Sequence, residues 1–149
     1  EISECLVGSE MCIRDSYSAN GQAVSMQTRQ GRSVVLIWGY QGQHIIAQID
    51  GSSLEEVKSQ GIVPDLIASR EEPTEEDWRL LNQLRSRLPN AQVVTTRYEP
   101  LVGIVSQTDA RGVTYRYTYD EFNRLCEVIE TGEQEHVLRK TEYKYATEY

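Results

Sequence analysis

The stretch Asp109–Leu125, with the sequence DARGVTYRYTYDEFNRL, decides the fold class of this chain. Its centre alternates large side chains with threonine and arginine, which is the period-two pattern of a β-strand with one half-buried face. The larger side chains that share this face are Val113, Tyr115, Tyr117 and Tyr119. Turn-forming residues stand at both ends, in Asp109–Gly112 and in Asp120–Asn123. The stretch therefore predicts one strand of an antiparallel meander, held between two tight turns.

Similar strand-forming runs lie on both sides of this stretch. Runs that recur every ~10–12 residues with short turns between them are typical of consecutive hairpins. The predicted strands of this part are 92–99, 101–107, 113–119, 125–130 and 135–145, with a further turn at 131–133. Two more strands, at 33–38 and 44–49, follow the turn dipeptide Asn20-Gly21, so residues 17–52 are also predicted to form β-hairpins. The expected fold is mainly β, an antiparallel hairpin meander.

The middle of the chain changes from strand periodicity to helix periodicity. Ser53 with Glu56, and Thr74 with Asp77, have the spacing of capping boxes at helix N-termini. Apolar residues then recur at intervals of three and four, which indicates an amphipathic helix. They are Trp78, Leu81, Leu84 and Leu88, followed by the terminator Pro89-Asn90. We expect a helical insert at about 53–88, within a segment 53–90, and we interpret the acidic run Glu71–Asp77 as a solvated helix entrance.

Residues 1–16 are set apart from the rest of the chain. Cys5–Ser16, CLVGSEMCIRDS, has neither a strand nor a helix period and lacks the pattern of a signal peptide. It resembles a peptide that arises when sequencing-adaptor sequence is translated. We therefore expect residues 1–16 to be non-native and the true N-terminus to be missing.

Composition excludes several classes of protein. The 149 residues suit about one domain, and the net charge of −8 disfavours binding to a phosphate backbone, which needs a Lys/Arg footprint. No apolar run approaches the ~18–20 residues of a membrane helix. We expect no nucleic-acid partner and no membrane span.

The residue types that carry chemistry are sparse. His44, His136 and Cys126 lie in separate predicted strands without further potential metal ligands, so we interpret them as ordinary strand residues. Asp109 and Asp120 could form an acid–base pair, but carboxylates in turns usually bond the local backbone. Trp38 and Trp78 could stack on sugars, although core packing is the simpler interpretation. We expect no enzymatic activity, and no catalytic, metal-binding or cofactor-binding residues.

The decisive stretch resembles the RHS/YD repeat. The family pattern is a turn glycine, a Tyr-bearing strand ending in Tyr-Asp, two residues, and then Gly-Arg-Leu. The residues assigned to this motif are Gly112, Tyr115, Tyr117, Tyr119, Asp120, Asn123, Arg124 and Leu125. Asn123 stands where the family has glycine, and asparagine tolerates the left-handed backbone best among the other residues. We expect Asp120 to bond the downstream backbone, and Arg124 to stack on a tyrosine or pair with Asp120.

Weaker resemblances extend this assignment along the chain. Thr131–Glu133 with Tyr143–Tyr145 resembles a degenerate second unit, so residues 91–149 are assigned to RHS/YD hairpins. Trp38–Gln43 and Tyr98–Gly103 resemble stretches of large RHS proteins, particularly those of Bacteroidetes.

The resemblance implies a structural function outside the cytoplasm. In such proteins, which are secreted or lie at the cell surface, the hairpins wind into a hollow shell that can enclose a toxin or another effector. The implied partners are neighbouring repeats and that effector. The family can also carry an aspartyl self-cleaving site, but no segment of this sequence matches it. A different hypothesis is a module that binds cell-surface glycans through Tyr and Trp faces.

Overall fold

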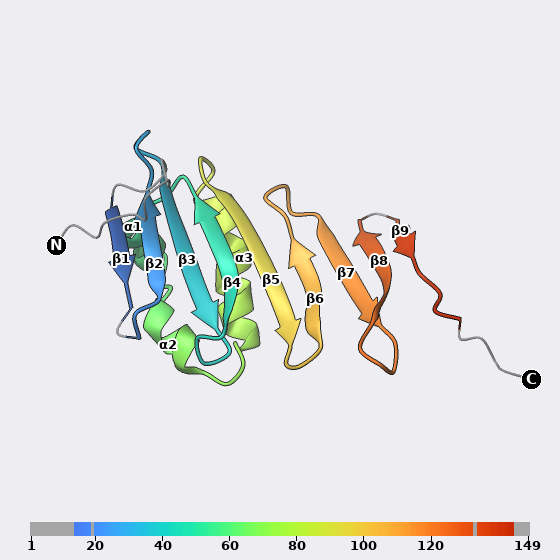
Figure 1. Cartoon of the computed structure of the whole chain (residues 1–149). Coiled ribbons are helices and arrows are strands. Elements are labelled where there is room, and N and C mark those ends of the chain that lie inside the picture. Colours follow the sequence, from blue (N-terminus) through green and yellow to red (C-terminus); the bar gives the residue numbers. More distant parts are fainter. Residues whose placement is uncertain (1–13, 19, 133, 145–149) are drawn as a thin grey trace, which may run out of the picture. The chain divides into compact units, whose positions relative to one another are not determined.

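The computed structural model describes residues 14–18, 20–132 and 134–144 (Figure 1). Cys5, Cys12 and most of the segment expected to be non-native lie outside the described residues. The chain divides into two compact units, Glu1–Thr95 and Thr96–Tyr149. Each unit is described by itself below.

The strands of the first unit form antiparallel neighbours in sequence order. They are β1 (Arg14–Tyr17), β2 (Ala23–Gln27), β3 (Ser33–Gly39), β4 (His44–Asp50) and the first half of β5 (Gln92–Glu99). Three residues assigned by sequence to the non-native segment, Arg14–Ser16, thus pair with β2 through their backbone.

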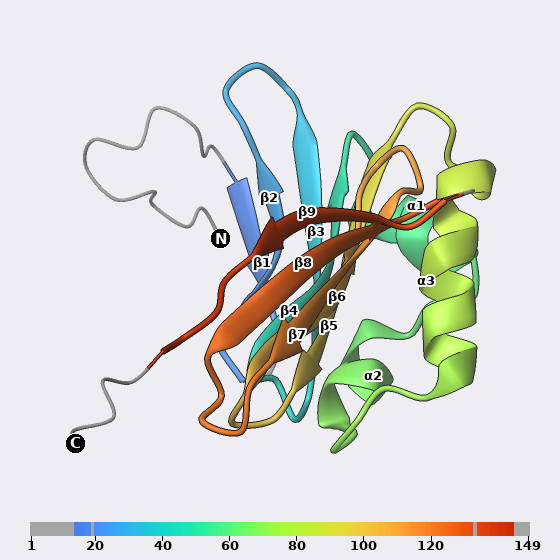
Figure 2. The ribbon, with the colours of Figure 1, turned by 90° about the vertical axis from the view of Figure 1, so that its right-hand side faces the viewer.

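Three helices between β4 and β5 form the helical insert. They are α1 (Leu54–Ser59), α2 (Pro64–Ser69) and α3 (Glu75–Arg87), and Figure 2 shows them on the same side of β3 and β4. Both predicted capping boxes are present, because Ser53 and Thr74 each accept a hydrogen bond from the amide three residues on. Helix α2 was not expected from the sequence; it begins with Pro64 and its N-cap, Val63, makes no side-chain cap.

The core of the first unit lies between the helices and the sheet. Val35, Ile49 and Val93 are cross-strand neighbours on β3, β4 and β5, and each is fully buried. Leu81 and Leu84 on α3 are also fully buried, and the Trp78 side chain is 4% exposed. Because the apolar stripe predicted on α3 is the buried one, the insert is an integral layer of this unit.

The second unit is a meander of hairpins. Beyond the end of β5 it comprises β6 (Gly103–Thr108), β7 (Thr114–Tyr119), β8 (Leu125–Thr131) and β9 (His136–Lys140), and β6 to β9 pair antiparallel in sequence order. The expected fold class, mainly β with an antiparallel meander and a helical insert, is therefore confirmed. Strand β6 starts later than predicted because Val102 donates to the Glu99 carbonyl and closes a turn, and β9 ends earlier, at Lys140.

Candidate functional site

The tyrosines of β7 lie on one face of the second unit. Tyr115, Tyr117 and Tyr119 are half-buried, whereas Arg116 and Thr118 are exposed, as the alternating sequence predicts. Their cross-strand neighbours on β8 are Glu130, Val128 and Leu125.

The turn before β7 is organised by Asp109. The Asp109 amide donates to the Val113 carbonyl (2.9 Å), and the Gly112 amide donates back to the Asp109 carbonyl (3.0 Å). One carboxylate oxygen accepts from the amides of Arg111 (2.9 Å) and Val113 (3.0 Å). Gly112 has a φ of +85°, a conformation that glycine adopts without steric cost.

The turn after β7 repeats this arrangement around Asp120. The Asp120 amide donates to the Arg124 carbonyl (2.9 Å) and the Asn123 amide to the Asp120 carbonyl (3.0 Å). One carboxylate oxygen accepts from the amides of Phe122 and Arg124, both at 2.9 Å. Asn123 occupies the glycine position with a φ of +59°. The two aspartates therefore cap matching turns at the two ends of one strand.

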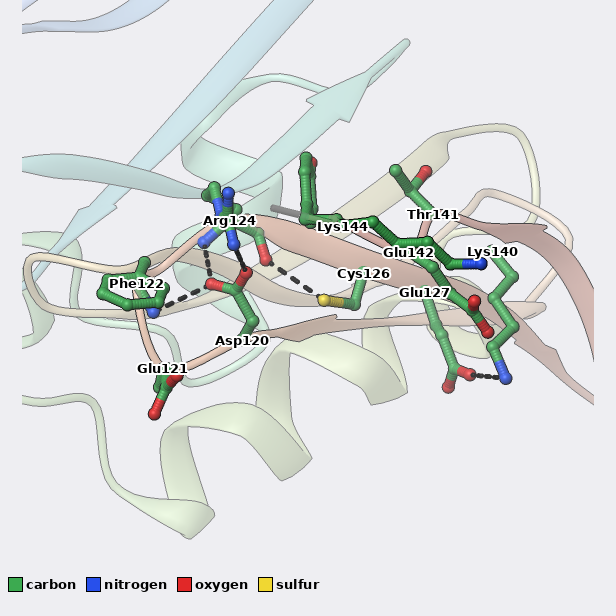
Figure 3. Close-up of a pocket in the computed structure, with 11 residues that line it drawn as sticks. Asp120, Glu121, Phe122, Arg124, Cys126, Glu127, Lys140, Thr141, Glu142 and Lys144 are labelled. Carbon is green, nitrogen blue, oxygen red and sulfur yellow. Dashed lines mark hydrogen bonds and ion pairs between the residues drawn. The ribbon is translucent and has the colours of Figure 1, made fainter. Parts of the chain in front are cut away.

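Arg124 joins the Asp120 turn to the chain beyond β9. Its Nε donates to the second carboxylate oxygen of Asp120 at 2.7 Å (Figure 3). The guanidinium carbon also lies 4.0 Å from the centre of the Tyr143 ring and 5.3 Å from that of Phe122. Both expected partners of Arg124, a tyrosine ring and Asp120, are thus engaged at once.

These contacts keep both turn aspartates charged. Burial by itself would raise the pKa of Asp109 and of Asp120, but the hydrogen bonds from turn amides and arginines outweigh it and lower both values. A lowered carboxyl pKa stabilises the fold above the unfolded value of about 3.9, and this contribution is lost as the pH falls through the folded pKa. The two carboxylates therefore contribute stability at neutral pH that is lost in acid.

Two tyrosine hydroxyls of this unit bond the backbone of a preceding strand. Tyr119 Oη donates to the Ile104 carbonyl (2.6 Å), and Tyr143 Oη donates to the Leu125 carbonyl (3.1 Å). Ile104 stands six residues after Tyr98, and Leu125 stands six residues after Tyr119. The two acceptors therefore hold the same position relative to the preceding tyrosine. Burial of the Tyr119 hydroxyl, and then the nearby Tyr117, raise the pKa of Tyr119 and keep its proton available as a donor.

Replacing Tyr119 with phenylalanine tests this link. We expect Tyr119→Phe to lower the free energy of opening of β7 by about 1 kcal/mol, the usual net value of one intramolecular hydrogen bond. Hydrogen exchange of the β7 amides measures it. Tyr117→Phe is the matched control, because the Tyr117 hydroxyl has no hydrogen bond to the described residues; an equal loss in both variants would contradict the assignment.

The backbone of Asn123 gives a second test. We expect Asn123→Val to destabilise the β7–β8 hairpin by about 1–2 kcal/mol, because a β-branched side chain clashes with the backbone at positive φ. The variant Asn123→Gly should match or exceed the stability of the parent chain. Hydrogen exchange of the β8 amides reports both, and a tolerated valine would show that the positive φ is not required.

An open pocket of about 560 Å³ lies beside the Asp120 turn (Figure 3). It is bordered by the turn, by β8 and by Lys140–Lys144. Phe122 and Tyr143 at its rim are 60% and 43% exposed. Inside it, the Cys126 thiol donates to the Arg124 carbonyl (3.6 Å), and Lys140 pairs with Glu127 (3.6 Å).

The other residues considered from the sequence are dispersed. Asp109 and Asp120 stand at opposite ends of the six residues of β7, about 20 Å of extended chain, whereas a glycosidase pair needs about 5–9.5 Å. They therefore cannot act as one acid–base pair. Trp78 is buried in the core, and Trp38 donates its indole N–H to the Ala23 carbonyl (2.8 Å).

The two histidines also lie far apart in the chain. His44 contacts the Tyr40 ring edge to face, with the ring centres 5.8 Å apart, and His136 is exposed on β9. Among the described residues, no three His, Cys, Asp or Glu side chains gather as a metal site would require. Nor does the described part of the chain contain a helix with the length and apolar character to cross a bilayer.

Comparison with known families identifies the segment built on these two turns. Residues 103–134 match the model of the RHS repeat. The matched segment comprises β6, β7, β8 and both aspartate-capped turns, and all eight residues assigned to the motif from the sequence lie within it. No curated protein matches the chain.

Among solved structures, the fold is similar to part of the crystal structure of TcdB2–TccC3 without its hypervariable C-terminal region. The identity is 17% and the TM-score 0.54, and the likeness covers 93% of this chain but only 6% of that one. It extends well beyond the RHS repeat itself and concerns the fold alone.

Two details of this site were not specified by the sequence. One is which tyrosine stacks on Arg124, namely Tyr143, and the other is the placement of Tyr119 over Gly103, where a Cβ atom would lie 3.0 Å from the hydroxyl. The spacing of Tyr98, Tyr119 and Tyr143 is the signal that could have indicated both.

Proposed function

We propose that this chain is a structural segment of a longer RHS-repeat protein and contributes one strip of a β-sheet shell. The observation that carries the proposal is that a tyrosine hydroxyl bonds the backbone of a preceding strand at two corresponding places, Tyr119 to Ile104 and Tyr143 to Leu125. Such bonds stabilise one strand through its neighbour, as the stacked units of repeat proteins generally do.

The use of the polar side chains favours a scaffold over an enzyme. The carboxylates of Asp109 and Asp120 accept hydrogen bonds from turn amides and from arginine side chains. A general acid or base needs a proton-exchanging atom directed at a substrate. The chain is similar in fold to a stretch that makes up only 6% of a large solved chain. This similarity further supports the proposal that it is a segment of a longer protein.

The finer parts of the proposal concern location and cargo. The full protein is secreted or displayed at the cell surface, and its shell encloses a toxin or another effector. The direct partners of this segment are then the flanking repeats along the sheet and, on the inner side, the enclosed polypeptide.

Electron microscopy of the protein expressed from the longer reading frame that contains residues 17–144 tests this function. We expect a closed, hollow particle with a β-sheet wall, and density inside it when the effector is included. A compact particle in which these residues form an isolated domain, without flanking hairpins, would refute the proposal.

A further inference from the structure

The hydrogen-bond pattern of the two RHS turns recurs twice near the start of the first unit. The amides of Ser18 and Thr28 donate to the carbonyls of Gln22 and Arg32, both at 2.8 Å. The amides of Gly21 (3.0 Å) and Gly31 (2.9 Å) donate back to the carbonyls of Ser18 and Thr28. These are the two backbone bonds that close the Asp109 and Asp120 turns.

The side chain of the first turn residue also makes the same hydrogen bond in these turns. Ser18 Oγ accepts from the Gln22 amide (3.3 Å) and Thr28 Oγ1 accepts from the Arg32 amide (3.1 Å), as the aspartates do from Val113 and Arg124. Gly21 and Gly31 have φ values of +78° and +81°, close to the +85° of Gly112. All four turns therefore share one architecture, with a hydroxyl in place of a carboxylate in the first two.

The Thr28 turn matches the Asp120 turn in sequence as well as in geometry. Gly31-Arg32 stands three and four residues after Thr28, as Asn123-Arg124 does after Asp120. The threonine, however, has no second oxygen with which to hold the guanidinium of Arg32. In the Asp120 turn that oxygen binds Arg124.

The carboxylate that Thr28 lacks is supplied from a different strand. Arg32 Nε donates to Asp50, the last residue of β4, in a pair whose side chains are 54% and 22% exposed. The next amide, that of Gly51, donates to the Ser33 carbonyl (2.7 Å) beside it. Both contacts fix the end of β4, from which the chain continues into the helical insert.

We propose that the Thr28 turn is a diverged RHS turn and that Asp50 is a positioning residue that replaces its carboxylate. The assignment rests on the repeat role proposed above. Asp50 holds Arg32 as Asp120 holds Arg124, but from across the sheet, so the pair anchors the start of the helical insert to a repeat hairpin. A purely local turn contact has become a contact between two hairpins.

Moving the carboxylate back to the turn tests this assignment. We expect Asp50→Asn to raise the equilibrium constant of urea unfolding of the first unit roughly three- to five-fold, as for the loss of an exposed ion pair. Adding Thr28→Asp to Asp50→Asn should restore the parent value to within about a factor of 1.5. Tryptophan fluorescence follows the first unit, since Trp38 and Trp78 both belong to it.

The matched control uses the sister turn. Ser18→Asp in the Asp50→Asn background should give no rescue, because residue 22 is glutamine and supplies no guanidinium. Exchange of the Arg32 Nε–H proton with solvent, followed by NMR, gives a second readout. We expect slow exchange in the parent and rescued chains and fast exchange in Asp50→Asn alone.

Two results would overturn the inference. One is an Asp50→Asn chain with unchanged unfolding and unchanged Nε–H exchange, and the other is a failed rescue by Thr28→Asp or an equal rescue by Ser18→Asp. Neither result bears on the shell proposal, because the particle seen by electron microscopy does not depend on Asp50.

Discussion

Replacing Leu81 with alanine should lower the free energy of unfolding of the first unit by about 3–5 kcal/mol, the range for fully buried leucines. Leu81 is fully buried on α3 and faces a sheet whose residues at Val35, Ile49 and Val93 are also fully buried. Truncation would leave a cavity in the layer between helix and sheet. Urea unfolding followed by tryptophan fluorescence measures the change.

Leu66 on α2 provides the control for this substitution, since its side chain is 50% exposed. Leu66→Ala should cost less than about 1 kcal/mol because no sealed cavity forms. If the two variants lost similar, small amounts of stability, α3 would not be a packed layer of the first unit.

Removal of the Asp77 carboxylate should have the second largest effect. Asp77 accepts hydrogen bonds from the Thr74 amide (2.8 Å) and pairs with Arg70, and the residue is only 6% exposed. Asp77→Ala removes the capping box of α3 and leaves Arg70 without its carboxylate partner, so we expect a loss of about 2–3 kcal/mol. Urea unfolding at neutral pH measures it, and a loss below about 0.5 kcal/mol would contradict the assignment.

The same carboxylate sets an acid dependence. Burial would raise the pKa of Asp77, but hydrogen bonds from Arg70 and Thr74 outweigh it and lower the value. Its stabilisation is thus complete above the unfolded pKa of about 3.9 and disappears as the pH falls through the folded pKa. Asp77→Asn should flatten the loss of stability below about pH 4, whereas Glu72→Gln, an exposed change of equal charge, should leave the slope unaltered.

Local sequence signals predicted much of the fold for identifiable physical reasons. Period-two alternation placed β7, and the capping boxes at Ser53 and Thr74 placed the starts of α1 and α3. These features depend on residues no more than four apart, so one sequence contains the whole signal.

Features that depend on distant partners were not predicted. Helix α2 is six residues long and lacks a side-chain cap, so its packing rather than its sequence determines it. Stacking of Arg124 on a tyrosine was expected, but its partner was not identified, because Tyr143 lies 19 positions away; the pair between Arg32 and Asp50 spans 18. The Ser18 and Thr28 turns have a visible pattern, but a hydroxyl at the capping position is a weaker signal than aspartate.

Cross-strand nuclear Overhauser effects provide the sharpest test that the second unit consists of consecutive repeat hairpins. We expect backbone contacts between β6 and β7 at Gln107 with Tyr115, between β7 and β8 at Tyr117 with Val128, and between β8 and β9 at Glu127 with Lys140. All three must occur in one folded species. Pairing of β7 with a strand other than β6 and β8, or a shift of its register by one residue, would contradict the repeat assignment.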